Sequence, residues 1–377
     1  MTIIRPLNFE ELKEAVRLAD LVFRDSDQPS MGAAFPNMFS SHLSGQSYGA
    51  FEEGRLVSFL GLVPSIVQMG PARLKTYSLG SVCTHPDFRG KGYAGEILKE
   101  VISHADKARA SLLLVSGSRS LYRRADCHPF GDAQRFSLDG ASAQSLLDQA
   151  SPTLNFRELE PTDWLELVEV SRSRTAYFEQ SVWDLSVLIE AEAFASVNKH
   201  RHKVLVAEED GCIAGFIVLG VPFAGEVRPV VYERAGDHEV VSALMAYAVQ
   251  SFHLNSLDIP VSWYEHDLRQ TLSSLSSKKE RNFGTVKVIR AERLLEQLRP
   301  FLQMKDAKLN NQINACSVEE GRVELQIGRK RTVFSDEEFV SLLFDKEPKN
   351  DQANRIDHSL ASLFPIPFPY TAGLNYV

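Results

Sequence analysis

The sequence lacks the features of several large classes of protein. No apolar run approaches the ~18–20 residues that a membrane-spanning helix needs, and the amino terminus, MTIIRPLNFEELKEAV, does not have the pattern of a signal peptide. Positive charge is not in excess, because 41 Lys and Arg against 49 Asp and Glu give a formal net charge of −8. This balance does not favour bulk binding to nucleic acid or to anionic membranes.

Cysteine is scarce. Cys83, Cys127, Cys212 and Cys316 show neither the spacing of metal ligands nor a Cys-x-x-Cys pair. Cys83 and Cys212 fall in strand patterns, where a small buried apolar side chain is the usual role. We therefore expect no metal site, and a reducing, cytoplasmic location.

Two common nucleotide motifs are also missing, since the chain has no Gly-Lys-Ser/Thr P-loop and no Gly-x-Gly-x-x-Gly fingerprint. The composition itself, with 44% hydrophobic and 24% charged residues, is that of an ordinary globular protein. A length of 377 residues suggests two or three domains.

The most informative stretch is Arg89-Gly90-Lys91-Gly92-Tyr93-Ala94. A strand-like segment, Tyr77 to Thr84, precedes it, and an amphipathic helix pattern follows from Ala94 to Ala105. A strand, a glycine-rich turn and a helix start together form an anion site, because the first helical N–H groups have no intrahelical partner and the helix dipole adds positive charge. The pattern predicts a pyrophosphate site; the alternative is an ordinary strand-to-helix turn.

The flanking segments support the first interpretation. A short strand, Tyr48 to Phe51, a turn containing Gly54 and a longer strand, Leu56 to Val67, predict a hairpin ahead of the motif. A buried strand, Ser111 to Val115, and a further strand, Ala133 to Leu138, follow the helix. This order, with the motif SVCTHPDFRGKGYAGEIL, resembles the GCN5-related N-acetyltransferase (GNAT) superfamily over roughly residues 1–150.

The resemblance implies a role for individual residues. The backbone of the strand residues Val82, Cys83 and Thr84 would pair with the pantetheine arm of acetyl-CoA, and the main-chain N–H groups from Arg89 to Ala94 would bind the pyrophosphate. Tyr122 occupies the place of the tyrosine that protonates the departing CoA thiolate, which is coherent chemistry because the leaving sulfur needs an acid. The alternative for Tyr122 is a core or surface tyrosine at a helix start. The basic residues near this site could meet a 3′-phosphate or form a solvated face: Arg119, Arg123 and Arg124.

The chain repeats this hairpin. GAFEEGRLVSFLGLVP (Gly49–Pro64) and LVAEEDGCIAGFIVLGVP (Leu205–Pro222) share a short strand, a Glu-Glu turn with glycine, a longer apolar strand and a proline exit. Residues 151–292 are therefore predicted to be a second copy of the fold, with chance similarity of two hairpins as the alternative. Its turn, Glu233 to His238, has lost the glycine pair and carries Glu233 and Asp237, which would repel a pyrophosphate. We predict a degenerate copy that does not bind CoA.

Residues 293–377 differ again, with a helix, three short strands and a second helix, Asp336 to Phe344, which has Ser335 and Glu338 in capping-box positions. This order resembles the small sterol-carrier-like domain of the Eis-type acetyltransferases, which join an active GNAT domain, a degenerate copy and this third domain. The predicted fold is thus mixed α/β (α+β): two tandem GNAT folds, with domains at 1–150 and 151–292, and a small C-terminal α+β domain at 293–377.

The carboxyl terminus, LFPIPFPYTAGLNYV, has no charged side chain and is rich in proline and aromatic residues. Such a segment is expected to dock in a groove, because prolines reduce the entropy lost when it is ordered. In Eis-type enzymes the terminal carboxylate serves as the general base, and here the resemblance assigns this role to Val377. The alternative is a packing tail whose carboxylate lies in solvent.

The resemblance therefore implies an acetyl-CoA-dependent N-acetyltransferase that acts on a primary amine of aminoglycoside, polyamine or lysine type. A non-catalytic acetyl-CoA-binding or scaffold protein is the alternative. We expect no metal, nucleic-acid or membrane partner, and a homo-oligomer stays open. Glu265 is one acidic residue that could hold a cationic amine, although such a residue is more often a solvated loop charge.

Overall fold

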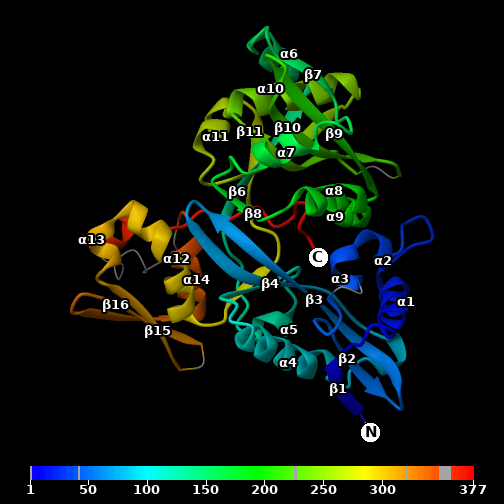
Figure 1. The fold of residues 1–377 in the computed structure, drawn as a ribbon, viewed down its shortest axis with the longest axis vertical. Helices are drawn as coiled ribbons and strands as arrows, with labels where there is room; N and C mark the ends of the chain where they lie inside the picture. The colour runs from blue at the N-terminus through cyan, green and yellow to red at the C-terminus, as the bar shows by residue number, and fades with distance from the viewer. Residues whose placement is uncertain (1, 41–42, 225–226, 320, 348–357) are drawn as a thin grey trace. The chain divides into compact units, whose positions relative to one another are not determined.

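The computed structural model describes residues 2–40, 43–224, 227–319, 321–347 and 358–377 (Figure 1). By their contacts, the residues group into two compact units. The first comprises residues within 1–131, 283–368 and 377, and the second comprises residues within 132–282 and 369–376. The fold is mixed α/β, and each unit is built on a large mixed sheet.

The first sheet has the strand order β1-β2-β3-β4-β5-β14. Neighbouring strands run antiparallel, except that β4 and β5 are parallel. The pattern accounts for these strands, since apolar residues recur along them and glycine turns join β2 to β3 and β3 to β4. The strands are β1 (Thr2–Pro6), β2 (Tyr48–Glu52), β3 (Arg55–Met69), β4 (Ala72–Thr84), β5 (Leu112–Val115) and β14 (Thr285–Val288).

Helices pack on both faces of this sheet. Along β3, Leu60 and Leu62 join the apolar core formed with α4, whereas Gly61 between them lies against Met38 of α3. The helical elements of residues 12–123 are α1 (Leu12–Phe23), α2 (Met31–Ala34), α3 (Pro36–Phe39), the 3₁₀ turn η2 (Pro86–Phe88), α4 (Tyr93–Lys107) and α5 (Ser120–Arg123).

A polar cluster fixes α4 on the sheet. The two ring nitrogens of His104 lie 3.1 Å from the Tyr48 hydroxyl and 3.2 Å from the Tyr77 hydroxyl, and Tyr77 also donates to Gln46 at 2.9 Å. Burial lowers the pKa of His104, so the neutral ring, with one donor and one acceptor nitrogen, is the form that fits this cluster.

The second sheet repeats the first. Its order is β13-β6-β12-β11-β10-β9-β7, and its neighbours are antiparallel except for the parallel pair β11 and β12. The two similar hairpins that the sequence shows therefore belong to two sheets of similar strand order. The strands are β6 (Asp132–Asp139), β7 (Asn155–Glu158), β9 (His200–Glu209), β10 (Cys212–Pro222), β11 (Val230–Gly236), β12 (Ser256–Ser262) and β13 (Ser276–Arg281).

Two cores cover the faces of this second sheet. Leu205 and Ala207 of β9 pack with α10, whereas Val206 between them packs with α7 and α8. The remaining elements of this unit are α6 (Gly140–Asp148), α7 (Trp164–Ser171), β8 (Ala176–Phe178), α8 (Val182–Ala191), α9 (Ala193–Val197), α10 (His238–Ser251) and α11 (His266–Thr271).

The sheets do not divide where the sequence predicts domain limits. The strand Ala133 to Leu138 is predicted to close the first domain, but it forms β6 and lies between β12 and β13 of the second sheet. In the first sheet, β14 pairs with β5 instead. The limit at 150/151 thus separates strands of both sheets, whereas the limit at 292/293 lies beyond the last strand of either. The alternation of side chains predicts a strand but does not say which distant strand it pairs with.

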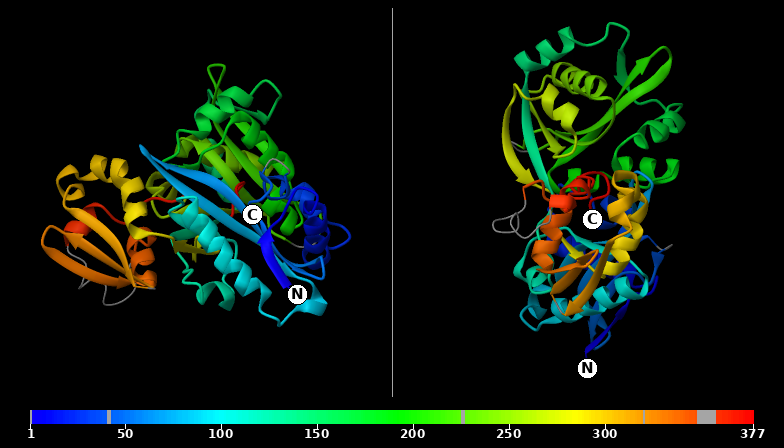
Figure 2. Two further views of the ribbon diagram at one scale, coloured as in Figure 1. Left: turned by 60° about the horizontal axis from the view of Figure 1, so that its bottom comes forward. Right: turned by 90° about the vertical axis from the view of Figure 1, so that its left-hand side faces the viewer.

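The region after β14 forms a small layer of its own, shown in orange in Figure 2. The three strands are antiparallel in the order β15-β16-β17. Helix α12 contacts β4, since Gln297 accepts hydrogen bonds from Lys75 N–H at 2.8 Å and from the Ser111 hydroxyl at 2.9 Å. This region therefore groups with the first unit. Its elements are α12 (Ala291–Lys305), α13 (Ala307–Asn310), β15 (Ile313–Glu319), β16 (Arg322–Ile327), β17 (Lys330–Ser335), α14 (Asp336–Phe344) and the 3₁₀ helix η3 (His358–Ser362).

The predicted capping box is confirmed at α14. The Ser335 hydroxyl accepts from Glu338 N–H at 3.2 Å, while the Glu338 carboxylate accepts from Ser335 N–H at 2.8 Å. Two otherwise unpaired N–H groups are thereby satisfied at the helix start.

Candidate active site

Strands β4 and β5 separate halfway along β4. Their parallel pairing runs from Thr76 opposite Leu112 to Leu79 opposite Val115, and Ser116 N–H then donates to Leu79 O at 3.0 Å. β4 continues to Thr84 paired only with β3 among the described residues. An extended ligand could therefore pair with the free edge of β4.

The predicted pantetheine-binding residues lie on this free part of β4. Val82, Cys83 and Thr84 follow the last pair with β5 by three to five positions. Burial raises the pKa of the Cys83 thiol to about 12, so the sulfur stays protonated and is unsuited to nucleophilic chemistry. This segment can therefore contribute to a site through the hydrogen-bonding groups of its backbone.

A turn rich in unpaired N–H groups follows β4. Within the described part of the chain, the backbone N–H groups from Gly90 to Ala94 have no hydrogen-bond acceptor, and the first helical bonds run from Gly95 and Glu96 to Gly92 O at 3.0 and 3.2 Å. Five successive donors at a helix start provide the geometry expected for an anion site.

The two glycines of this turn are required by backbone conformation. Gly90 has φ = 79°, and Gly92, the N-cap of α4, has φ = 82°. A Cβ atom at either residue would meet no protein atom within 4 Å, so protein packing does not explain the choice of glycine. The left-handed φ does, because glycine adopts it without steric cost.

Two cations, Arg89 and Lys91, lie at the turn, but one of them is paired. The ammonium group of Lys91 lies 3.1 Å from the Glu52 carboxylate. The hydrogen bonds from Lys91 and from the Tyr93 hydroxyl hold the pKa of Glu52 below its usual value. Arg89 is exposed, and its Nε donates to Thr84 O at 3.4 Å. Glu52, which the sequence did not single out, thus reduces the local positive charge.

Tyr122 lies on α5 and is buried, with 5% of its surface exposed. It belongs to the core that contains Leu79 and Val115, the residues at which the pairing of β4 and β5 ends. Gly117 leaves room for the ring, since a Cβ there would lie 3.0 Å from Cε2 of Tyr122. Burial alone fits a core tyrosine as well as a catalytic one, but the position next to the strand separation favours the catalytic role.

The terminal carboxyl group lies against β4. An ideal Cβ on Gly80 would be 2.3 Å from the carboxyl carbon of Val377 and 3.1 Å from Oγ of Ser116. Gly80 directly follows the last β4 residue paired with β5. The carboxylate of Val377 therefore reaches the point at which the two strands separate.

Residues 369–376 of the tail are held within the second unit. The buried Asn282 side chain donates to Pro369 O at 3.0 Å and accepts from Thr371 N–H at 2.7 Å. Leu374 is part of an apolar core, and the ring of Tyr376 lies 4.4 Å from that of Phe194. The apolar tail is thus packed, as its composition predicts.

In the second copy, an arginine side chain crosses the corresponding place between two parallel strands, beside a pocket of about 340 Å³. β11 and β12 share a single parallel pair, Val230 opposite Asp258. Beyond it, the Arg234 side chain donates to Pro260 O at 2.9 Å and to the Glu265 carboxylate at 2.7 Å. Glu265 is therefore a partner of Arg234 rather than an open acceptor site for an amine.

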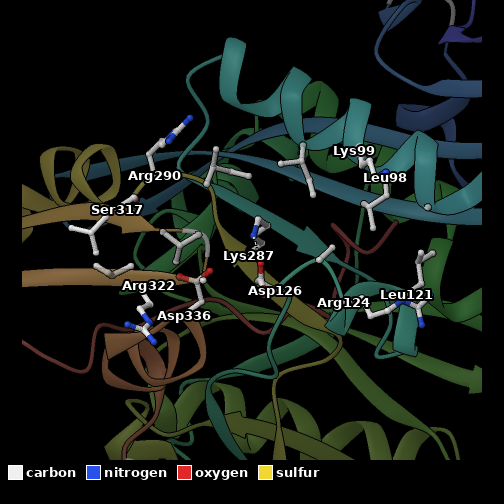
Figure 3. A pocket seen from close by; sticks show the side chains of 18 of the residues that line it. Leu98, Lys99, Leu121, Arg124, Asp126, Lys287, Arg290, Ser317, Arg322 and Asp336 are labelled. Carbon is white, nitrogen blue, oxygen red and sulfur yellow. Dashed lines mark hydrogen bonds and ion pairs between the residues drawn. The ribbon is translucent and has the colours of Figure 1, made fainter. Parts of the chain in front are cut away.

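A cavity of about 750 Å³ lies in the first unit among α4, α5, β14, the β15–β16 hairpin and α14. Figure 3 shows Lys287 and Asp126 facing each other inside it, 3.4 Å apart. Lys99 and Arg124 line its α4–α5 end, whereas burial raises the pKa of Asp336 at the opposite wall. The sequence did not reveal this cavity, because its walls come from segments about 200 residues apart.

The described residues contain no group of three or more His, Cys, Asp or Glu side chains placed to hold a metal ion. No helix in the described ranges is both long and apolar enough to cross a membrane.

Comparison with known proteins finds a relationship for the first part of the chain. Residues 3–130 match the family described as an acetyltransferase (GNAT) domain. This matched segment carries the β4 strand and the glycine turn. A search of curated proteins gave no match.

Solved structures share the fold along most of the chain. A GCN5-related N-acetyltransferase from Anabaena variabilis is 10% identical, with 98% of this chain and 99% of that chain covered and a TM-score of 0.67. A protein from Enterococcus faecalis described as a probable N-acyltransferase is 15% identical, with coverages of 89% and 85% and a TM-score of 0.64. Eis1 from Mycobacterium abscessus is 12% identical, with coverages of 79% and 76% and a TM-score of 0.54. The overall fold is thus Eis-like.

Proposed function

We propose that the chain transfers the acetyl group of acetyl-CoA to a primary amine, at the point where β4 and β5 separate. The observation that carries this proposal is the contact of the Val377 carboxyl group with Gly80. It places a carboxylate at the part of β4 that the acyl thioester would reach if the pyrophosphate lay at the turn from Gly90 to Ala94.

The donor fits the residues that are present. Unpaired N–H groups at the glycine turn suit a pyrophosphate, and the free edge of β4 from Val82 to Thr84 suits the amide groups of pantetheine. Arg124, at the α4–α5 end of the cavity in Figure 3, could meet a 3′-phosphate.

The chemical step then needs a base, an oxyanion donor and an acid. The carboxylate of Val377 accepts a proton from the amine, whose nitrogen forms a bond to the thioester carbon. The carbon–sulfur bond breaks, and the Tyr122 hydroxyl gives its proton to the departing thiolate. Solvent then returns a proton to Tyr122 and removes one from Val377.

The acceptor is proposed as a class only. The resemblance suggests an aminoglycoside, a polyamine or a lysine side chain. The decisive experiment incubates the protein with acetyl-CoA and one amine of each type, and measures release of the CoA thiol. Transfer to at least one amine would support the proposal. Tight binding of acetyl-CoA without transfer to any amine would favour the alternative, an acetyl-CoA-binding scaffold.

The general base is tested by semisynthesis of a protein whose C-terminus is an amide. The amide keeps the apolar contacts of the tail but removes the negative charge. We expect turnover to fall while acetyl-CoA binding is kept. Full activity of the amide would leave the tail with a packing role alone.

A further inference from the structure

Ser81 has an unusual backbone conformation. Its φ is +50°, in the left-handed region that residues other than glycine, asparagine and aspartate seldom adopt. It lies in a bulge of β4, because the register with β3 passes from Gly61 opposite Gly80 to Phe59 opposite Cys83. Bulges of this kind redirect a side chain and are frequent beside active sites.

The hydroxyl group of Ser81 has no partner. The residue is 9% exposed, and its Oγ is buried without a hydrogen bond to any described residue. A buried polar group without a partner destabilises the fold, and alanine or glycine would avoid this cost. A strained backbone and an unpaired hydroxyl at one residue together indicate a ligand that completes the hydrogen bond.

The surroundings of Ser81 indicate which part of the ligand this is. Ser81 stands two positions beyond Leu79, the last residue of β4 paired with β5. Its neighbour Gly80 touches the terminal carboxyl group and lies close to Ser116, and Gly117 touches the ring of Tyr122. The terminal carboxylate proposed as base and the Tyr122 ring proposed as acid therefore both lie close to this part of β4.

We propose that the Ser81 hydroxyl donates a hydrogen bond to the carbonyl oxygen of the bound acyl thioester. The inference rests on the proposed function and adds a side-chain donor to it. When the amine bonds to the carbonyl carbon, the carbonyl oxygen becomes an oxyanion, and a donor already in place stabilises that charge. No covalent bond to Ser81 forms or breaks; the hydrogen bond strengthens and then relaxes as the thiolate leaves.

Two substitutions separate this role from a structural one. Ser81→Ala removes the donor and keeps a side chain, whereas Ser81→Gly removes the donor and also relieves the left-handed φ. In both we expect kcat to fall roughly 100-fold, the effect typical of one lost oxyanion donor, with unchanged affinity for CoA itself. Ser78→Ala, which changes another buried serine of β4 in its paired part, is the control and should keep kcat.

A spectroscopic measurement makes the test independent of the amine. The infrared carbonyl stretch of acetyl-CoA labelled with ¹³C at the thioester carbon is recorded bound to the wild type, to Ser81→Gly and to Ser78→Ala. A hydrogen bond lowers the frequency, so we expect a higher frequency in Ser81→Gly than in the other two.

Equal frequencies in all three proteins, or wild-type kcat in Ser81→Gly, would overturn the role of Ser81 and leave the proposed function intact. If the wild type does not bind acetyl-CoA, the proposed function fails and the role of Ser81 fails with it.

Discussion

Gly80→Ala tests the position of the terminal carboxylate with a single methyl group. The added Cβ would lie 2.3 Å from the carboxyl carbon of Val377, so the carboxyl group must retreat by about 1.1 Å to reach ordinary contact at 3.4 Å. A 1 Å misplacement of a reacting group can lower a rate about 100-fold. We therefore expect kcat to fall by about that factor.

The assay compares four proteins: the wild type, Gly80→Ala, a variant lacking Val377, and the double variant. If the methyl group acts only by displacing the carboxylate, the double variant should be no slower than the variant lacking Val377, because one interaction cannot be lost twice. The affinity for CoA should be unchanged in all four. Gly140→Ala, whose Cβ would meet no atom within 4 Å, is the matched control.

Two results would contradict this reasoning. Wild-type kcat in Gly80→Ala would mean that the carboxylate need not lie on β4 for turnover. Multiplicative losses in the double variant would mean that Gly80 and Val377 act independently, so the contact would have no catalytic consequence.

Four further predictions concern the cofactor, the acid, the second copy and pH. Gly92→Glu should abolish acetyl-CoA binding measured by calorimetry, because a carboxylate would enter the anion site; Gly92→Ala, with the same left-handed strain but no charge, should lose less. Tyr122→Phe should lower kcat by about 10²–10⁴-fold while acetyl-CoA affinity is kept; unchanged turnover would remove it from the mechanism. Titration should give one CoA site per chain, and two equivalent sites would refute the prediction that the second copy does not bind CoA. Burial lowers the pKa of His200 to about 4, so the folded state binds fewer protons than the unfolded state between pH 6.5 and 4. In urea unfolding, stability should therefore fall as pH falls through this window, by at most about 1.4 kcal/mol per pH unit, and His200→Gln should flatten the curve.

The sequence predicts the local elements well, because local patterns determine them. The glycine turn before α4 can be recognised from its residues, because the positive φ that Gly90 and Gly92 adopt favours glycine. The helix that follows has a regular apolar period. The capping box at Ser335 likewise involves only residues within four positions of one another. Each of these features depends on neighbours in the sequence.

Features that depend on residues distant in the sequence could not be predicted from it. The strand pattern of β6 is plain, yet only the structure shows that it pairs with β12 and β13. The glycine at position 80 could be noted as an interruption of a strand, but its partner is the last residue of the chain. In the same way, Glu52 pairs with Lys91 from a strand about 40 residues earlier. No motif in the sequence links this strand residue to the glycine turn.

The two copies differ in what lies where their parallel strands separate. Six strands of each sheet follow the same order and directions, including a parallel pair that is followed by a turn and a helix. In the first copy, the edge of β4 that faces away from β3 stays unpaired beyond Leu79 among the described residues. In the second, the guanidinium of Arg234 bridges from β11 to Pro260 O and to Glu265.

In the second copy, the guanidinium of Arg234 bonds to Pro260 O and to Glu265, although its Nε is buried without a partner among the described residues. In the first copy, no described residue accepts from the N–H groups of the glycine turn or pairs with the hydroxyl of Ser81. Because a ligand can satisfy such groups, we expect CoA to bind the first copy and not the second.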